Sequence, residues 1–413
     1  MRRTPSRRLV AAALLAASVL IPTTMTSAVA TTATATAVTG TTSAPHRDGC
    51  PPAAAAGLGR TTTARLDKAV ADVRRQAGIP GVVVGLWLPG KGCYVRATGV
   101  ADTTTHRPMT TGLYARIGSE TKTFTVTALL RLVDEGRIRL DDPISRYVRG
   151  VPNGRHITLR HLAEMRSGLF PYTADRDFVH DLLSDTGRSF TPRETLAYGF
   201  RHDNTFAPGE RFEYSNTNLV LLGLVIEKVT GRSAADVIDR RVLRPAGLGH
   251  TLLPGGPEFP DPHARGYTAQ TLSGAVADAT DWNPSWAWTA GAMISDLHDL
   301  RSWARTVATG TLLSPETQRQ RLRMLPTGFP GLDYGLGIFE SGGWIGHNGS
   351  IPGYETVTVY LPPLKATLVV ILNTDITYGG QEPSSLVARA VTEVVTPDHV
   401  YDRPVPSNEQ SLR

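Results

Sequence analysis

The chain has 413 residues, of which 41% are hydrophobic and 19% charged, a composition that is ordinary for a globular protein and excludes a disordered or fibrous one. The formal charge of +6 suggests a nucleic-acid-binding protein, but four of the arginines lie in residues 1–30, and charges of both signs are interspersed along the rest. We therefore expect no nucleic-acid partner.

The first 30 residues have the three parts of a secretory signal peptide. Arginines come first, an apolar run follows over residues 9–21, and an Ala-Val-Ala cleavage site ends at residue 30. The apolar run is too short to cross a bilayer, and no later stretch is long and apolar enough to do so. We therefore expect a secreted, extracellular protein without a stable membrane anchor. Residues 31–48, rich in Thr and Ala, predict a flexible leader.

The chain after this leader begins with a helix and a hairpin. Residues 61–76 predict a helix, and residues 82–88 and 93–100 predict an antiparallel hairpin around a Pro-Gly-Lys-Gly turn. Longer helical periodicity is expected over residues 290–308. Strand-like runs are expected at residues 335–339, 344–347, 355–360 and 366–372. A last amphipathic helix is expected at residues 384–395.

These elements predict a body whose two sequence halves flank a helical insertion. Residues 49–140 and 291–395 would form the sheet-containing domain, and residues 141–290, rich in turns and short helices, would form a helical subdomain. Residues 396–413 look like a loose tail. We find no internal repeats.

Cys50 and Cys93 are the only cysteines. In an oxidising compartment two lone cysteines commonly pair, and such a bridge would stabilise the fold by about 4 kcal/mol on the loop-entropy model. The alternative is a pair of unpaired thiols. No histidine is placed to activate either one as a nucleophile.

Ser119 and Lys122 open an apolar-periodic run that predicts a helix ending near Gly136. Positions i and i+3 share one face of a helix, so the Lys122 amine can reach the Ser119 hydroxyl. Partial burial would lower the pKa of this lysine, which could then remove the hydroxyl proton and make the serine a nucleophile. The alternative is a surface helix start, where Ser-x-x-Lys pairs are common.

Two further polar groups lie at the ends of predicted elements. Tyr214 and Asn216 stand at a loop-to-helix junction, where a tyrosine can relay a proton and an asparagine can bind a substrate amide. Alternatively, Ser215 or Asn216 caps the helix and Tyr214 is a half-buried packing residue. His347 and Gly349 end a strand in a glycine-rich turn that lets a substrate approach closely, unless this is an ordinary strand end.

Several other chemistries have no motif in the sequence. There is no His-Glu-x-x-His zinc motif, two cysteines cannot build a thiolate metal site, and no glycine loop for phosphate or dinucleotides is present. The Gly-x-Ser-x-Gly turn of α/β-hydrolases is missing as well. We expect neither a metal nor a cofactor.

The order of the three groups carries a resemblance to a known family. The series Ser119-x-x-Lys122, Tyr214-x-Asn216 and His347-x-Gly349 resembles the three motifs of the serine penicillin-recognising enzymes, the β-lactamases and D,D-peptidases. Four more stretches resemble those of the secreted actinomycete D-alanyl-D-alanine carboxypeptidases, relatives of class C β-lactamases and family VIII esterases: residues 132–136, 166–169, 214–218 and 289–295. The resemblance covers residues 61–395 and implies an α/β fold, with an antiparallel sheet flanked by helices plus an all-helical subdomain.

The same resemblance implies a role for each reacting residue. Ser119 would be the acylated nucleophile and Lys122 would accept its proton. Tyr214 would pass a proton to the leaving group and then help to activate water. His347 would take the place that lysine usually fills in the third motif, and would polarise or orient the tyrosine.

Substrate contacts are also implied by the resemblance. Asn216 would hold the acyl-side amide of the substrate, and the N–H groups of Ser119 and of Ser350, which follows Gly349, would form an oxyanion hole worth on the order of 3 kcal/mol per donor. Three aromatic side chains could line the pocket, although core packing is the alternative for each: Trp286, Phe170 and Tyr172.

Two departures from the carboxypeptidases limit the substrate assignment. Asn348 stands where those enzymes have threonine, and Ile338, Phe339 and Glu340 follow a Gly-Leu-Gly turn where those enzymes carry an arginine for the terminal carboxylate. The missing cation leaves room for esters, amides or other D-residue peptides.

Three hypotheses follow. The first is a D-alanyl-D-alanine carboxypeptidase or related D-peptidase that acts on small peptides derived from peptidoglycan and reacts with β-lactams. The second is a β-lactamase or an esterase with the same residues, and the third is a non-catalytic penicillin-binding or wall-sensing module. We expect a monomer.

Overall fold

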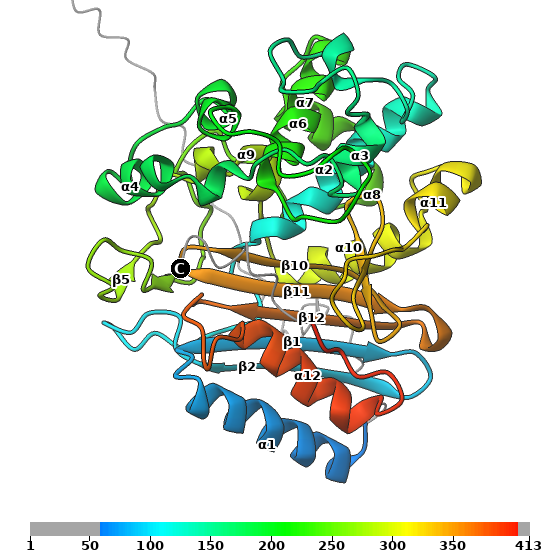
Figure 1. Ribbon diagram of the computed structural model, residues 1–413. Coiled ribbons are helices and arrows are strands. Elements are labelled where there is room, and N and C mark those ends of the chain that lie inside the picture. The colour runs from blue at the N-terminus through cyan, green and yellow to red at the C-terminus, as the bar shows by residue number, and fades with distance from the viewer. Residues whose placement is uncertain (1–57, 404–413) are drawn as a thin grey trace, which may run out of the picture. The chain divides into compact units, whose positions relative to one another are not determined.

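The computed structural model describes residues 58–403, and these residues form an antiparallel sheet flanked by helices (Figure 1). The expected fold class is therefore confirmed. The sheet has eight strands in the order β2-β1-β12-β11-β10-β9-β8-β7. In that order the strands span Gly92–Gly99, Gly81–Leu88, Ala366–Leu372, Tyr354–Leu361, Trp344–Ile351, Phe339–Ser341, Asp333–Tyr334 and Leu325–Pro326. Two small pairs lie outside it, β3 (Ala115–Arg116) with β6 (Ile294–Ser295) and β4 (Tyr267–Thr268) with β5 (Ala277–Asp278).

The helices lie on both faces of the sheet. The α-helices are α1 (Arg60–Gln76), α2 (Thr121–Asp134), α3 (Leu159–Ala163), α4 (Arg176–Ser184), α5 (Pro192–Phe200), α6 (Asn216–Thr230), α7 (Ala234–Ile238), α8 (Arg244–Ala246), α9 (Trp288–Gly291), α10 (Leu297–Thr309), α11 (Pro315–Arg321) and α12 (Pro383–Val395). The 3-10 turns are η1 (Gly118–Glu120), η2 (Ile144–Arg146), η3 (Tyr172–Ala174), η5 (Pro284–Trp286) and η6 (Pro362–Leu364), and η4 (Asp239–Leu243) is a π-helix. In the described part of the chain, no helix has the length and apolarity that a membrane crossing requires.

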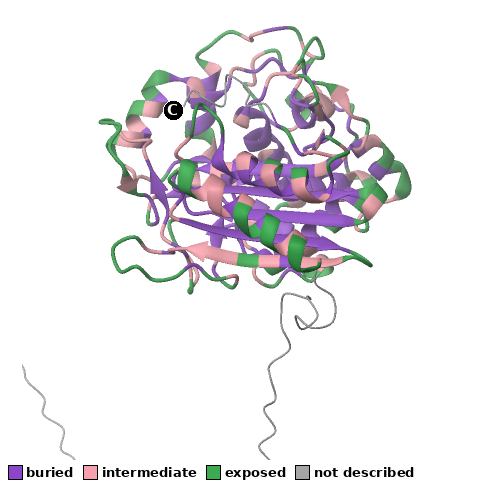
Figure 2. Cartoon of the chain, turned by 90° about the horizontal axis from the view of Figure 1, so that it is seen from below, coloured by how far each residue is buried: buried purple, intermediate pink, exposed green. Residues whose placement is uncertain are grey.

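The central strands are apolar along their whole length because helices cover both of their faces. Every residue of β1 and β12 is buried. Helices α1 and α12 pack on one face of the sheet, and α10 packs on the other (Figure 1). Figure 2 shows this as buried strands behind half-exposed helices. The sheet is therefore the rigid part of the molecule that can hold side chains in place.

The helical part contains two helices that are buried on nearly all sides, α2 and α6. Helix α2 starts directly at the turn that bears Ser119, and α6 starts at Asn216 and ends at Gly231, whose φ of 68° is the left-handed conformation usual after a helix. Both helices contact α9. A helix that is buried on all sides belongs to the interior of a protein. The burial of α2 and α6 therefore fixes the first turns of these helices, which carry the first and second motifs.

Three of the expected elements are wrong. Residues 335–338 are not part of one strand but the turn between β8 and β9, because the Gly335 N–H donates to the Ile338 carbonyl and Gly337 has a φ of 64°. His347 and Gly349 do not end a strand, because β10 continues through both of them in its pairing with β11. Residues 290–308 are not one helix, because β6 interrupts them to pair with β3. Helix α10 then begins afresh after Asp296, whose side chain accepts from the Asp299 N–H.

The expected loose tail needs correction for residues 396–403. Tyr401 is 0% exposed and Arg403 is 6% exposed. The segment stays in place because its backbone accepts side-chain hydrogen bonds: Trp344 Nε1 donates to the His399 carbonyl at 2.8 Å, and Ser341 Oγ donates to the Asp402 carbonyl at 2.8 Å. A stretch without periodicity therefore belongs to the core.

Gly223 in α6 provides a test of how closely α6 and α9 pack. Alanine normally stabilises a helix interior by about 1 kcal/mol relative to glycine. A Cβ at position 223 would lie 2.4 Å from Thr289 Oγ1 and 2.6 Å from the Trp288 ring, so we predict that Gly223→Ala lowers the free energy of unfolding by about 1–2 kcal/mol. Chemical denaturation measures the change. Gly112→Ala, where a Cβ would meet nothing within 4 Å, is the control and should be neutral, and an equally neutral Gly223→Ala would contradict the close packing.

Candidate active site

Ser119 and Lys122 are brought together by the turn η1 and the first residues of α2. Lys122 Nζ donates to Ser119 Oγ at 2.8 Å and to the Ala290 carbonyl of α9 at 2.8 Å. Lys122 is 0% exposed, whereas Ser119 is partly exposed. A substrate can therefore reach the hydroxyl while the amine beside it is shielded from water, which is the arrangement that a general base for a serine nucleophile requires.

The turn that carries Ser119 is held from two sides. Thr121 Oγ1 donates to the Gly118 carbonyl at 2.7 Å and accepts from the Met293 N–H at 3.1 Å. Gly118 has a φ of 50°, a left-handed backbone conformation that is strained for any residue with a side chain. The nucleophile therefore stands on a turn that is held by hydrogen bonds of the Thr121 side chain to two backbone groups.

Tyr214 covers the amine from the helical side. Its ring centroid lies 4.7 Å from Lys122 Nζ, and the side chain is 6% exposed. An ammonium over an aromatic face is stabilised by the ring. Asn216, the first residue of α6, lies two residues after Tyr214 and is half-buried. The structure thus places the first and second motifs against each other, as the Ser119–Lys122 and Tyr214–Asn216 pairs predict.

His347 completes the group from β10. The histidine is 1% exposed, and its ring centroid lies 6.3 Å from that of Tyr214. Burial, and then the positive charge of Lys122, hold the pKa of His347 well below its usual value of 6.5, so the imidazole is neutral at pH 7. A neutral histidine supplies a lone pair and one N–H, unlike the permanent cation that a lysine would place there.

The hydrogen bonds of His347 define its tautomer. Nδ1 lies against the Asn348 carbonyl, which can only accept, so the proton is on Nδ1. Nε2 lies 3.1 Å from the Tyr334 hydroxyl, which must then be the donor. Tyr334 is a site residue that the sequence did not reveal. It lies on β8, which the Gly335–Gly337 turn places beside β9, the neighbour of β10 in the sheet.

The third motif touches the nucleophile turn through glycine backbones. A Cβ on Gly349 would lie 1.9 Å from the Ile117 carbonyl oxygen, and one on Gly118 would lie 2.6 Å from the Ser350 backbone nitrogen. These contacts bring the backbones that precede Ser119 and Ser350 side by side. The predicted oxyanion hole requires this proximity, and its two N–H donors remain a prediction.

The aromatic side chains expected in the pocket have packing partners. Tyr172 is 0% exposed, and its hydroxyl donates to the Trp286 carbonyl at 2.7 Å, so Tyr172 is a core residue. Trp286 is 5% exposed and packs against Phe178. Phe170 is partly exposed and stacks on His202 with ring centroids 3.9 Å apart. Of the three, Phe170 has the surface that a ligand could use.

Glu120, which the sequence did not single out, is the buried neighbour of the nucleophile. The side chain is 1% exposed and neither carboxyl oxygen has a hydrogen-bond partner among the described residues. Burial raises the pKa of Glu120 to about 8, and the hydroxyls of Thr356 and Thr358 offset only part of this effect. The carboxyl group is therefore neutral at pH 7 and places no negative charge beside Ser119.

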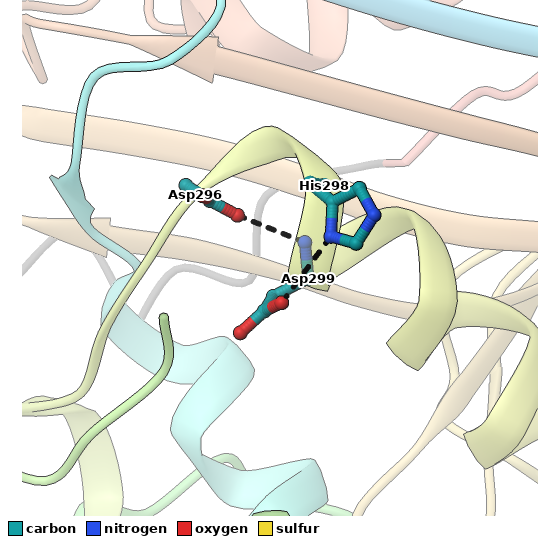
Figure 3. A group of neighbouring side chains, drawn as sticks. All are labelled: Asp296, His298 and Asp299. Carbon is teal, nitrogen blue, oxygen red and sulfur yellow. Dashed lines mark hydrogen bonds and ion pairs between the residues drawn. The ribbon is translucent and has the colours of Figure 1, made fainter. Parts of the chain in front are cut away.

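One group in residues 58–403 has the side chains that a metal ion could use, namely Asp296, His298 and Asp299 (Figure 3). Both carboxylates already have structural hydrogen bonds. Asp296 caps α10, and Asp299 accepts from the His250 N–H at 2.7 Å and from Thr251 Oγ1 at 2.8 Å. We therefore interpret this group as structural side chains at the start of α10 and not as metal ligands.

The cysteine prediction falls partly outside the described residues. Cys93 lies on β2 and is half-buried, and the described part of the chain contains no free cysteine. Cys50 lies outside the described residues, so the Cys50–Cys93 bridge remains a prediction.

The antiparallel sheet flanked by helices, and the contact of the accessible Ser119 hydroxyl with the buried Lys122 amine, define the class of protein as a serine hydrolase. Comparison with known families identifies which one: the Beta-lactamase family model matches residues 66–390. The chain therefore belongs to the beta-lactamase family, within the serine β-lactamase and D,D-peptidase superfamily that its motifs resemble.

Two curated proteins show the range of its relatives. A penicillin-binding protein of Bacillus subtilis (strain 168) is 26% identical over 77% of this chain and 73% of its own length. A D-aminopeptidase of Brucella anthropi is 29% identical over 76% of this chain, but only 60% of its own length is spanned.

Two solved structures are similar over most of both chains. The D-stereospecific amidohydrolase from Streptomyces sp. is 32% identical, with a TM-score of 0.71 and coverage of 81% of this chain and 98% of its own. The D-amino acid amidase from Ochrobactrum anthropi SV3, complexed with L-phenylalanine amide, is 30% identical, with a TM-score of 0.72 and coverage of 82% and 99%.

The buried Glu120 generates a prediction about stability and pH. The folded-state pKa of about 8 lies above the usual value of 4.5, so unfolding between these values releases a proton and the contribution to stability is lost as the pH rises. Glu120→Gln removes this loss. We predict that the variant gains on the order of a few kcal/mol over the unchanged protein between pH 5 and pH 8.

Denaturation at several pH values measures this difference in the free energy of unfolding. Glu316→Gln, at an exposed position, is the control and should follow the unchanged protein. Parallel curves for Glu120→Gln and the unchanged protein across this pH range would show that Glu120 ionises normally in the fold.

Proposed function

We propose that the protein is a secreted serine acyl-hydrolase that cleaves amide bonds adjoining D-amino acids through an acyl-Ser119 intermediate. The observation that carries the proposal is the contact of 2.8 Å between Ser119 Oγ and the fully buried Lys122 amine, with Tyr214 against the same amine. The amidohydrolase, the amidase and the D-aminopeptidase among the relatives support the choice of a D-residue substrate.

The acylation step follows from these positions. In the reactive form Lys122 has lost its proton, and its amine takes the proton of Ser119 Oγ while Oγ forms a bond to the substrate carbonyl carbon. The negative charge on the carbonyl oxygen is stabilised by the N–H groups of Ser119 and Ser350. When the C–N bond breaks, the leaving nitrogen takes the hydroxyl proton of Tyr214. An ester of Ser119 then remains, with a Tyr214 phenolate beside the Lys122 ammonium.

Deacylation runs through the same groups. Tyr214, close to the positive charge on Lys122, accepts a proton from a water molecule that attacks the ester carbonyl. The bond from Oγ to the acyl carbon breaks, and Oγ takes back its proton from Lys122. The acid product leaves as a carboxylate after releasing a proton to the solvent. His347, whose Nε2 accepts a hydrogen bond from Tyr334, is uncharged, and it therefore adds no second positive charge beside Lys122.

A D-alanyl-D-alanine carboxypeptidase is the second candidate, and the match to a penicillin-binding protein favours it. Against it stand Ile338 and Phe339, which are 0% and 1% exposed where the carboxypeptidases carry a cation for the terminal carboxylate. Reaction with β-lactams belongs to both candidates, as does export by the leader in residues 1–30.

Initial rates on a matched set of substrates test the proposal. A D-amino acid amide and a peptide with a D-residue should be hydrolysed at least about 100-fold faster than their L-enantiomers. This ratio corresponds to a difference of about 3 kcal/mol in the binding of the two transition states. Preference for a D-alanyl-D-alanine peptide would favour the second candidate. Preference for a p-nitrophenyl ester or a cephalosporin, without stereoselectivity, would contradict the proposal.

Variants of the first motif provide the test of the chemistry. We predict that Ser119→Ala abolishes turnover and that Lys122→Ala lowers the acylation rate by several orders of magnitude. Lys122→Arg should not restore it, because a guanidinium does not lose its proton at working pH. Ser273→Ala and Lys228→Ala, both at exposed positions, are the controls. Full activity in Ser119→Ala would overturn the assignment.

Tyr334→Phe tests the tautomer of His347. The variant removes the donor to Nε2 and leaves a buried acceptor unsatisfied, so we predict a loss of about tenfold in acylation rate, equivalent to about 1.4 kcal/mol. Stopped-flow acylation kinetics measure the loss, and Tyr378→Phe, at a position 49% exposed, is the control. An unchanged rate would mean that Tyr334 does not act on the site.

A further inference from the structure

The segment after α12 brings a charged side chain behind the third motif. Arg403 Nη1 forms an ion pair with Glu382 Oε2 at 3.0 Å, and the two side chains are 3% and 1% exposed. The same Glu382 oxygen accepts from Asn348 Nδ2 at 2.9 Å. Asn348 lies between His347 and Gly349 on β10, so the ion pair is joined directly to the strand that carries the motif.

This contact explains why asparagine stands at position 348. Successive side chains of a strand point to opposite faces of a sheet. The side chain of Asn348 is used by Glu382 at the start of α12, while its neighbour His347 lies beside Tyr214 and Tyr334. The departure from the carboxypeptidases therefore has a structural partner on the α12 side of the sheet.

The negative charge of the group belongs to Glu382. The neighbouring Glu355 is buried, and its side chain accepts from the Ser384 N–H at 2.9 Å. Burial, followed by the charge of Glu382, raises the pKa of Glu355 well above its usual value, so Glu355 is neutral. One carboxylate then faces one guanidinium, and Asn348 is bound to that carboxylate by a charge-assisted hydrogen bond.

A second path leads from Arg403 to His347 through an aromatic ring. The guanidinium lies 5.7 Å from the ring centroid of Phe339, and that ring lies 5.3 Å from the imidazole of His347. Tyr401, two residues before Arg403, packs on the same ring with centroids 6.3 Å apart. The segment of residues 396–403 is therefore linked to the Asn348 side chain through Glu382, and to the His347 ring through Phe339.

We infer that Arg403 is a positioning residue of the active site, which holds β10 against the nucleophile turn through Glu382 and Asn348. The inference rests on the proposed function in one respect, namely that the turn bears the acylated serine. Gly349 and Gly118 make backbone contacts in which a Cβ would collide, so a small shift of β10 changes the space for the substrate carbonyl oxygen. A displacement of about 1 Å can lower a rate by about 100-fold.

A single variant cannot test this inference, because Arg403→Met leaves a buried carboxylate unpaired and destabilises the fold. Two double variants remove both charges and differ only in the residue at position 382. Arg403→Met with Glu382→Gln keeps an oxygen that can accept from Asn348, whereas Arg403→Met with Glu382→Leu offers none. Circular dichroism establishes that both are folded before they are compared.

The first measurement is hydrogen exchange, which needs no activity. We expect the amides of β10 to exchange at least about tenfold faster in the Leu pair than in the Gln pair, with β12 unchanged as the internal reference. The second is the acylation rate by a p-nitrophenyl ester, expected to fall about tenfold or more in the Leu pair while KM changes little.

The outcomes separate the inference from the proposed function. Equal exchange in β10 and equal acylation in the two folded double variants would show that the hydrogen bond from Asn348 to residue 382 does not hold β10, and would overturn the link through which Arg403 acts. An unchanged protein that no ester or β-lactam acylates would overturn the proposed function, and the exchange comparison would still decide how β10 is held.

Discussion

The contact between a fully buried lysine amine and a serine hydroxyl is the interaction on which the rest of the structure depends. Lys122 has no access to water, and its amine lies 2.8 Å from both Ser119 Oγ and the Ala290 carbonyl. An amine without hydration is stable in such a place only when oxygens and ring faces replace the water, or when it gives up its proton. The helical part supplies those replacements through α9 and Tyr214.

Two separate stretches of backbone then have to meet beside that amine. The nucleophile turn comes from the connection between β3 and α2, and the third motif comes from β10, more than 200 residues later. Gly118 and Gly349 allow a contact that no side chain could tolerate. The neutral His347 and the neutral Glu120 keep additional charge away from the amine. The site is therefore shaped by what is excluded from it, water and charge, as much as by the groups that react.

Part of this site could be predicted from the sequence because the information is local. Ser119 and Lys122 lie one helical turn apart, and their contact follows from the geometry of any helix. The order of the motifs pointed to Tyr214 and His347, and the structure brings them to Lys122. The fold class followed from the same resemblance, and the central strands were visible as apolar runs.

The remaining site residues depend on contacts that no local pattern contains. Tyr334 reaches His347 only because residues 335–338 form a tight turn, and those residues look like a strand when glycine conformations are unknown. Glu120 is buried beside threonines of β11. Arg403 belongs to a stretch without periodicity, whose carbonyl groups accept hydrogen bonds from the side chains of Trp344 and Ser341. Tertiary packing, and not propensity, decides the positions of all three.

Peptide-mapping mass spectrometry of the protein, quenched during turnover of a slowly deacylated ester or β-lactam, tests the central claim most directly. The account predicts an acyl group on the peptide that bears Ser119, on the oxygen of that residue. Turnover with Ser119 unmodified, or an acyl group on another residue, would contradict it.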